Sequence, residues 1–191
     1  MPFRRPLAAA LLALLAGCQA RKPAPAAAQL GPPAAAPRPA VDTSRVAIFL
    51  YDKERDRYIF QNAGPVKATV LSAVEFAIVD SLLIACIKDH NQAQAVELED
   101  MRKAVYKEYP KVQLHEERYL INLANYKRQL VAVTNAKGEK TVWINCFCRD
   151  DNQASWRQHI VSVDDGGNCY FNIKLNLTRR TWYDMMVNGV A

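Results

Sequence analysis

The sequence lacks a Cys-x-x-Cys pair and holds only three histidines among its 191 residues. The missing motif excludes the common thiol redox site. A zinc site usually takes its ligands from Cys-x₂₋₄-Cys loops, whereas Cys146 and Cys148 stand one residue apart in a strand-like run. His90, His115 and His159 lie among polar residues near segment ends, which is typical of solvated surface histidines. We therefore expect no metal site and no cofactor.

Acidic residues are absent from positions 1–41, which contain five basic residues. Positions 42–191 contain 20 basic and 19 acidic residues, so the formal net charge of +6 comes almost entirely from the N-terminal segment. A nearly neutral folded part gives no electrostatic reason to expect a polyanion partner. We expect no nucleic-acid partner.

The first 18 residues, MPFRRPLAAALLALLAGC, have the order of an export signal. Two arginines precede an apolar stretch over 7–15, which is too short to span a bilayer because spanning takes about 20 apolar residues. The last four, Leu15-Ala16-Gly17-Cys18, resemble the lipobox of bacterial lipoproteins. That resemblance implies cleavage before Cys18 and lipid attachment to it. The alternative is an ordinary cleaved signal with a chance cysteine.

Lipid on Cys18 implies a membrane-anchored protein of the cell envelope. Several acyl chains at ~0.8 kcal/mol per buried CH₂ give a stable anchor. Gln19 is not Asp, and lipoprotein sorting then favours the outer membrane where a cell has one. Six prolines between positions 19 and 39 indicate an extended, semi-rigid tether. We expect a signal peptide over 1–17, a lipidated tether over 18–41 and a single globular domain over 42–191.

Within 42–191 the periodicities predict strands and one long helix. A Ser72–Glu75 capping box begins the helix, which we expect to end near Asn91. A second helix is predicted over Ala95–Glu108, before Pro110. The segments with strand character are 46–51 and 57–60, as short strands or a hairpin, and 128–135, 140–148, 159–163, 168–177 and 182–187.

This order predicts the α+β class, with a long helix packed on an antiparallel, meander-like sheet. It loosely resembles cystatin-like domains, in which a sheet wraps around one long helix. Cystatins insert a Gln-x-Val-x-Gly loop into papain-like proteases, and Gln129–Val133 reads QLVAV, with Val133 in place of the glycine. A cystatin-like protease inhibitor is therefore an alternative function.

Four cysteines remain when Cys18 is assigned to lipid. Strand alternation places Cys146 and Cys148 on one apolar face, and Cys169 and Cys86 belong to apolar faces that should meet it. An even number of cysteines in an exported domain favours disulfides. We expect two, joining Cys146 and Cys148 to Cys169 and Cys86 in an undecided order. One disulfide with two buried thiols, or four buried thiols, are the alternatives.

The opposite strand face carries Trp143, Asn145 and Phe147, which Tyr170 is expected to join. Aromatic side chains interleaved with amides suit a surface that binds a peptide, a glycan or an envelope protein. The alternative is that the second helix or the N-terminal strands cover these rings as a second core layer.

The sequence thus predicts a membrane-anchored exported lipoprotein with a disulfide-stapled binding or structural domain. The turn Asp164–Asn168 lacks the ligand spacing of an EF-hand, so we interpret its glycines as hairpin residues. A Cys/His thiol enzyme or hydrolase is the alternative from another class, and it requires an accessible thiol beside a histidine.

Overall fold

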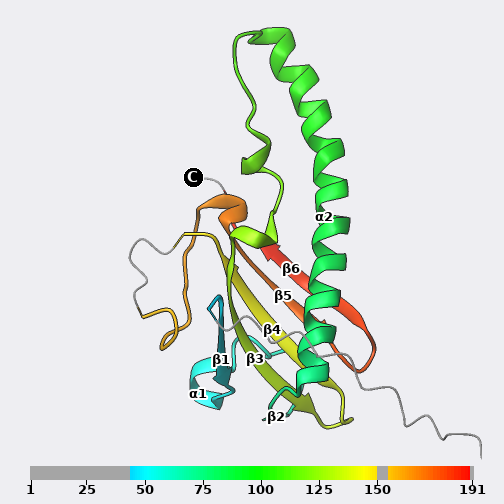
Figure 1. Cartoon of the computed structure of the whole chain (residues 1–191), viewed down its shortest axis with the longest axis vertical. Helices are drawn as coiled ribbons and strands as arrows, with labels where there is room; N and C mark the ends of the chain where they lie inside the picture. The colour runs from blue at the N-terminus through cyan, green and yellow to red at the C-terminus, as the bar shows by residue number, and fades with distance from the viewer. Residues whose placement is uncertain (1–43, 150–154, 190–191) are drawn as a thin grey trace, which may run out of the picture. The chain divides into compact units, whose positions relative to one another are not determined.

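A sheet of six strands and one long helix build the domain, which confirms the predicted α+β class (Figure 1). The computed structural model describes residues 44–149 and 155–189. Its helices are α1 (Lys53–Asp56) and α2 (Ala73–Glu108), with short 3₁₀ turns η1 (Glu116–Arg118), η2 (Leu123–Asn125) and η3 (Gly167–Cys169). Its strands are β1 (Val46–Leu50), β2 (Val66–Ala68), β3 (Lys127–Asn135), β4 (Lys140–Phe147), β5 (Tyr170–Asn176) and β6 (Thr181–Val187).

The sheet has the order β1-β3-β4-β5-β6. Strands β3 to β6 form the predicted antiparallel meander, and the β3–β4 hairpin turns at Gly138, whose φ is 78°. On the outer edge of β3, β1 pairs in parallel with its first half and β2 pairs antiparallel with its last residues. The parallel pairing of β1 was not predicted, because a parallel partner follows only after a long crossover that leaves no local signal.

The predicted strand over 57–60 is wrong. The Asp52 side chain caps α1 by accepting hydrogen bonds from the backbone N–H groups of Glu54 and Arg55. The chain then turns, and Ile59 and Phe60 are buried from this turn rather than from a strand. A side chain that satisfies free N–H groups stabilises a helical turn at this point.

Helix α2 is a single helix of 36 residues, so the predicted end near Asn91 and the separate second helix are wrong. The capping box of Ser72 and Glu75 is present at its start. No glycine or proline occurs between Asn91 and Glu108, and nothing there breaks the backbone hydrogen bonding. Figure 1 shows that the first part of α2 lies along the sheet, while its last turns project beyond the end of the sheet.

Two apolar cores lie on the two faces of the sheet. The core on the α2 side includes Leu83, Ile144 and Ile173, which are 0% exposed. The core on the other face includes Val131, Trp143 and Phe147. Among the residues that the structure describes, no helix is both long and apolar enough to cross a membrane.

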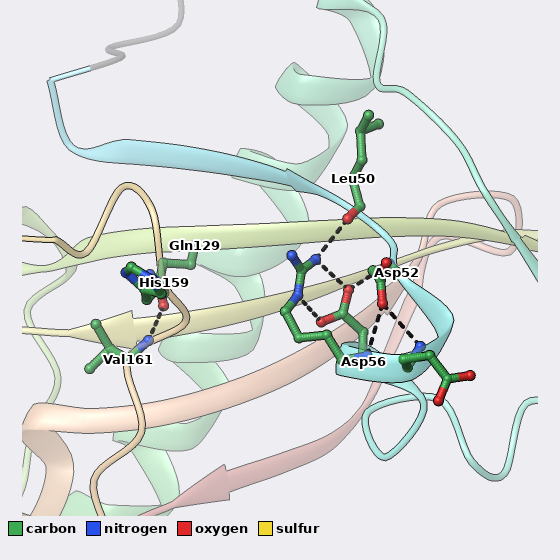
Figure 2. A network of polar contacts seen from close by, with 8 residues as sticks. Leu50, Asp52, Asp56, Gln129, His159 and Val161 are labelled. Carbon is green, nitrogen blue, oxygen red and sulfur yellow. Dashed lines mark hydrogen bonds and ion pairs between the residues drawn. The ribbon is translucent and has the colours of Figure 1, made fainter.

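A buried network of polar contacts follows the edge strand β1 (Figure 2). The Asp56 side chain is fully buried and accepts two hydrogen bonds of 2.6 Å from the Arg55 guanidinium, together with one from the backbone N–H of Asp52. Arg55 also donates to the Leu50 carbonyl, at 2.8 Å. The Asp56 carboxylate is thus paired and hydrogen-bonded, as a buried charge requires, and these contacts hold the chain where it turns after β1.

Candidate functional site

A disulfide joins Cys148 to Cys169 at one end of the sheet, with the two Cα atoms 5.0 Å apart. The register of β4 and β5 pairs Phe147 with Tyr170, so each cysteine lies one step beyond the paired strands. The backbone N–H of Cys148 also donates to the Cys169 carbonyl, at 2.9 Å. The structure therefore contains one of the predicted disulfides and fixes the end of β4 to η3.

The expectation of a second disulfide is wrong, because Cys86 and Cys146 are buried free thiols. Both belong to the core beneath α2, as predicted. Cys86 Sγ lies 3.6 Å from Met185 Sδ of β6, whereas Cys146 is on β4, two strands away. Adjacent strands are about 4.8 Å apart, so the path of α2 across the sheet directs Cys86 toward β6.

The buried thiols are poor nucleophiles. Burial raises the pKa of the Cys86 thiol to about 11, and burial also raises the pKa of the Cys146 thiol. The thiolate is the reactive form. In residues 44–149 and 155–189, no cysteine thus combines exposure with a free thiol, and nothing in this part of the chain supports the Cys/His enzyme alternative.

The aromatic strand face is not an open binding surface. Trp143, Asn145 and Phe147 are buried, and Tyr170 is half-buried against the same core. The face is covered by the turn after β1 and by residues 155–163, from which Trp156 packs edge-on against Phe147 at 5.8 Å between ring centroids. These side chains form the second core layer that was the alternative, although the covering segments differ from those expected.

The covering segment 155–163 is irregular, so the predicted strand over 159–163 is wrong. A buried amide holds it in place. Gln129 Nε2 donates to the carbonyls of Trp156 and His159. Its Oε1 accepts from the backbone N–H of Val161 (Figure 2).

Asn145, the cross-strand partner of Gln129, completes this network by donating to Gln129 Oε1 and to the Val161 carbonyl. The QLVAV stretch is thus buried in β3, so it does not form the exposed loop of a cystatin-like inhibitor.

A cleft of about 1110 Å³ lies beside the disulfide, and we take it as the candidate site. It is bounded by α2, by the segment from η1 to Tyr126, by the disulfide and by the end of β6. Charged groups of both signs line it, together with amides and apolar side chains. These residues include His90, Gln94, Glu116, Glu117, Arg118, Tyr119, Ile121, Asn122, Arg149, Asp165, Asn168, Val187 and Asn188.

Asparagine side chains hold the walls of this cleft. Asn91 exchanges two hydrogen bonds with the backbone of Ile121, at 2.8 and 2.9 Å. Asn168 Nδ2 donates to the carbonyls of Glu117 and Leu120. Because these amides bind backbone groups that no strand or helix satisfies, they fix irregular segments as a regular element would.

The far wall contains a turn that only glycine accommodates. Gly166 and Gly167 have φ values of 95° and 60°, as the prediction for this turn required, although the turn leads into η3 and not into a hairpin. A Cβ on Gly166 would lie 2.7 Å from the Tyr170 ring. Asn188 Nδ2 donates to the Asp165 carbonyl at 3.0 Å, which ties this turn to the end of β6.

The electrostatics of the cleft favour neutral inner groups and charged rims. Burial lowers the pKa of His90, which favours its neutral imidazole. Burial raises the pKa of Tyr126 to about 12, so its hydroxyl stays protonated and donates to the Asn168 carbonyl at 2.8 Å. Arg118 and Arg149 are exposed and supply positive charge at the rim.

Of the predicted site residues, the structure brings only Cys148 and Cys169 to the cleft, and Cys18 lies outside the described residues. Sequence reasoning missed the asparagines. Asn91, Asn168 and Asn188 lie at or next to the ends of predicted segments, but no local pattern says which backbone groups they reach. In the described part of the chain, no group of three or more His, Cys, Asp or Glu side chains is placed to hold a metal ion.

Comparisons with protein-family models, with curated proteins and with solved structures found no match. The lipoprotein and cystatin-like resemblances therefore stay predictions.

Proposed function

We propose that the protein is an exported lipoprotein of the cell envelope, attached by lipid at Cys18, whose domain binds a peptide segment of an envelope partner in the cleft beside the disulfide. The observation that carries the proposal is the Cys148–Cys169 disulfide. Disulfides persist in oxidising compartments outside the cytosol, which agrees with the export signal and lipobox of the first 18 residues.

The cleft supports a peptide rather than a glycan. Its volume of about 1110 Å³ exceeds the usual range for small ligands of about 300–1,000 Å³. The Tyr126 ring is buried, which leaves only the half-buried ring of Tyr119 among the lining tyrosines to face a sugar. Arg118, Arg149 and Asp165 instead present both signs of charge beside half-buried, apolar Leu120 and Val187, which suits the mixed side chains of a peptide.

Lipid attachment is tested by feeding bacteria that express the chain an alkyne-bearing fatty acid. We expect the wild type to be labelled and the Cys18→Ala variant to be unlabelled and released from membranes. Separation of the two membranes on a density gradient then tests location, with Gln19→Asp expected to move the protein from the outer to the inner membrane. Labelling of Cys18→Ala at the wild-type level would contradict the proposal.

Peptide binding is tested with a displayed random-peptide library selected on the oxidised protein. Enriched peptides should lose at least tenfold in affinity for Arg118→Glu combined with Arg149→Glu, because these arginines line the rim. Lys67→Glu combined with Lys137→Glu, two exposed residues at the other end of the sheet, is the matched control. Equal loss in the control and the cleft variant would show that net charge, not the cleft, determines binding.

A further inference from the structure

The last turns of α2 and the segment that returns from them form an arm, residues 92–120, beyond the end of the sheet (Figure 1). The helical part, 92–108, is about 25 Å long at 1.5 Å per residue. Arg102 donates to Glu116 across the arm at 2.9 Å, and Leu98 is buried, so helix and return segment are joined. The arm is therefore an ordered projection.

The tip of the arm, Arg102–Val112, is basic and partly apolar. It contains four basic residues and one acidic residue, Glu108. Tyr106, Tyr109 and Val112 are 39%, 60% and 44% exposed. Exposed apolar and aromatic groups between positive charges suit a partner that is both apolar and negative.

The lysines of the tip are available to such a partner. Lys103 makes only exposed contacts with Glu99 and Asp100, at 4.0 and 3.4 Å, and exposed pairs of this kind contribute little. Lys107 and Lys111 are exposed and make no ion pair with any residue that the structure describes. Lys103, Tyr106 and Lys107 are spaced by three and four residues, so they share one helix face.

The chain enters the domain at the same end of the sheet from which the arm projects. The Arg45 guanidinium donates to the Ala124 carbonyl, in the segment that returns from the arm. Val46, the first residue of β1, pairs with Arg128 at the start of β3. The described chain therefore begins on the side of the domain from which the arm projects.

We propose that the tip of the arm, Arg102–Val112, is a membrane-contact surface that binds anionic phospholipid headgroups. Tyrosine and lysine suit the boundary of a membrane, where a ring or an alkyl stem is buried and the polar end stays in water. Each lysine near an anionic surface contributes about a fivefold gain in affinity. A tip of 11 residues is smaller than one side of a stable protein interface, which takes about 20–30 residues, so a lipid surface fits better than an acidic protein.

The placement at a membrane rests on the proposed lipid at Cys18. Residues 18–43 reach about 80 Å if extended at about 3.1 Å per residue, which exceeds the length of the arm. A lipid anchor would thus permit the tip to contact the same membrane, and the anchor would raise the effective concentration of a contact that is weak alone.

The test replaces residues 1–18 by a hexahistidine tag and binds the chain to vesicles that contain a nickel-chelating lipid, so lipidation plays no part. An environment-sensitive dye is attached to Val112→Cys, since the native free thiols are buried. We expect a blue shift of the dye on phosphatidylcholine vesicles that contain phosphatidylglycerol, and none on phosphatidylcholine alone. The same dye at Ala136→Cys, in the β3–β4 hairpin, should not shift.

Charge variants complete the test. Without nickel lipid, Lys103→Gln, Lys107→Gln and Lys111→Gln together should lower partition onto phosphatidylglycerol vesicles about 100-fold, and added salt should act in the same direction. The matched control, Lys53→Gln, Lys67→Gln and Lys137→Gln, changes the net charge equally at exposed positions away from the arm, and should have little effect.

An unshifted dye at Val112→Cys, or equal losses in the two triple variants, would overturn the proposal. Either result would leave the lipidation of Cys18 unaffected, because that is measured separately by fatty-acid labelling.

Discussion

The two faces of the sheet are both buried, yet they are covered in different ways. On one face α2 packs with side chains such as Leu83 against an apolar surface. On the other face the cover is largely irregular chain, and Gln129 and Asn145 lie among the aromatic residues beneath it. A helix satisfies its own backbone, whereas irregular chain has free N–H and C=O groups that need partners when buried. The polar pair is what permits an irregular cover.

The difference explains why buried amides occur on only one face of β3 and β4 in the described core. Gln129 and Asn145 supply hydrogen bonds to the backbone of Trp156, His159 and Val161. Beneath α2, the core residues Leu130, Ile144 and Cys146 need not supply hydrogen bonds to the cover, because the helix satisfies its own backbone. The kind of cover determines the polarity of the face below it.

Replacing the buried amide should have the largest effect. Gln129→Leu removes four hydrogen bonds at about 1 kcal/mol each, and we expect a loss of about 4 kcal/mol in the free energy of unfolding. Urea denaturation measures this loss. Limited proteolysis should show new cleavage within residues 155–163. A stable variant with an uncut cover would mean that apolar packing alone holds this segment.

Truncating a core side chain on the helix side gives the matched comparison. Leu83 is 0% exposed, so Leu83→Ala should cost about 3 kcal/mol through lost burial and the cavity that remains. Proteolysis of residues 155–163 should not change, since this segment packs on the opposite face. If cleavage in 155–163 increased as much as in Gln129→Leu, the two covers would unfold together and the distinction would fail.

The disulfide should stabilise the domain independently of either cover. Cys148→Ser with Cys169→Ser opens a loop of 21 residues, and the loss should be about 3 kcal/mol. Before reduction, alkylation of the denatured domain should modify Cys86 and Cys146 only. A denatured domain with no alkylated cysteine would instead show a second disulfide, as the sequence suggested.

High pH should weaken the core on the α2 side of the sheet. The folded state raises the pKa of Cys86 from 9.0 to about 11 and that of Tyr126 from 10.0 to about 12. Both groups lose their protons more easily when unfolded, so their contribution is complete below about pH 9 and is lost as pH rises toward 12. Tyr126→Phe should flatten the fall of unfolding free energy between these limits, and exposed Tyr109→Phe should not. A steep fall in both variants would place the effect elsewhere.

Local patterns predicted much of the fold. The alternation of Val142, Ile144 and Cys146 identified the strand face beneath α2, and Ser72 with Glu75 identified the start of the helix. Both signals depend on neighbours in sequence. The alternation also predicted that Trp143 and Phe147 share the other face, but it does not show what covers that face.

The candidate site depends on contacts between distant residues, and most of it was not predictable. Asn168 binds carbonyls about 50 positions earlier in the chain, and Asn91 binds Ile121, 30 positions later. An asparagine at either place looks like a surface or turn residue. The prediction of a second disulfide was wrong for a similar reason. The path of α2 across the sheet determines which strand Cys86 contacts, and the local sequence does not show that path.

The parallel pairing of β1 with β3 also constrains when the domain can fold. Val46 pairs with Arg128, so the first strand to leave the translation or export machinery waits for a partner 82 positions behind it. Contacts of such long sequence separation form late and slow the folding of a domain. During that interval the apolar run from Ile48 to Leu50 is unpaired, and the nascent chain is most prone to aggregate or to need a chaperone.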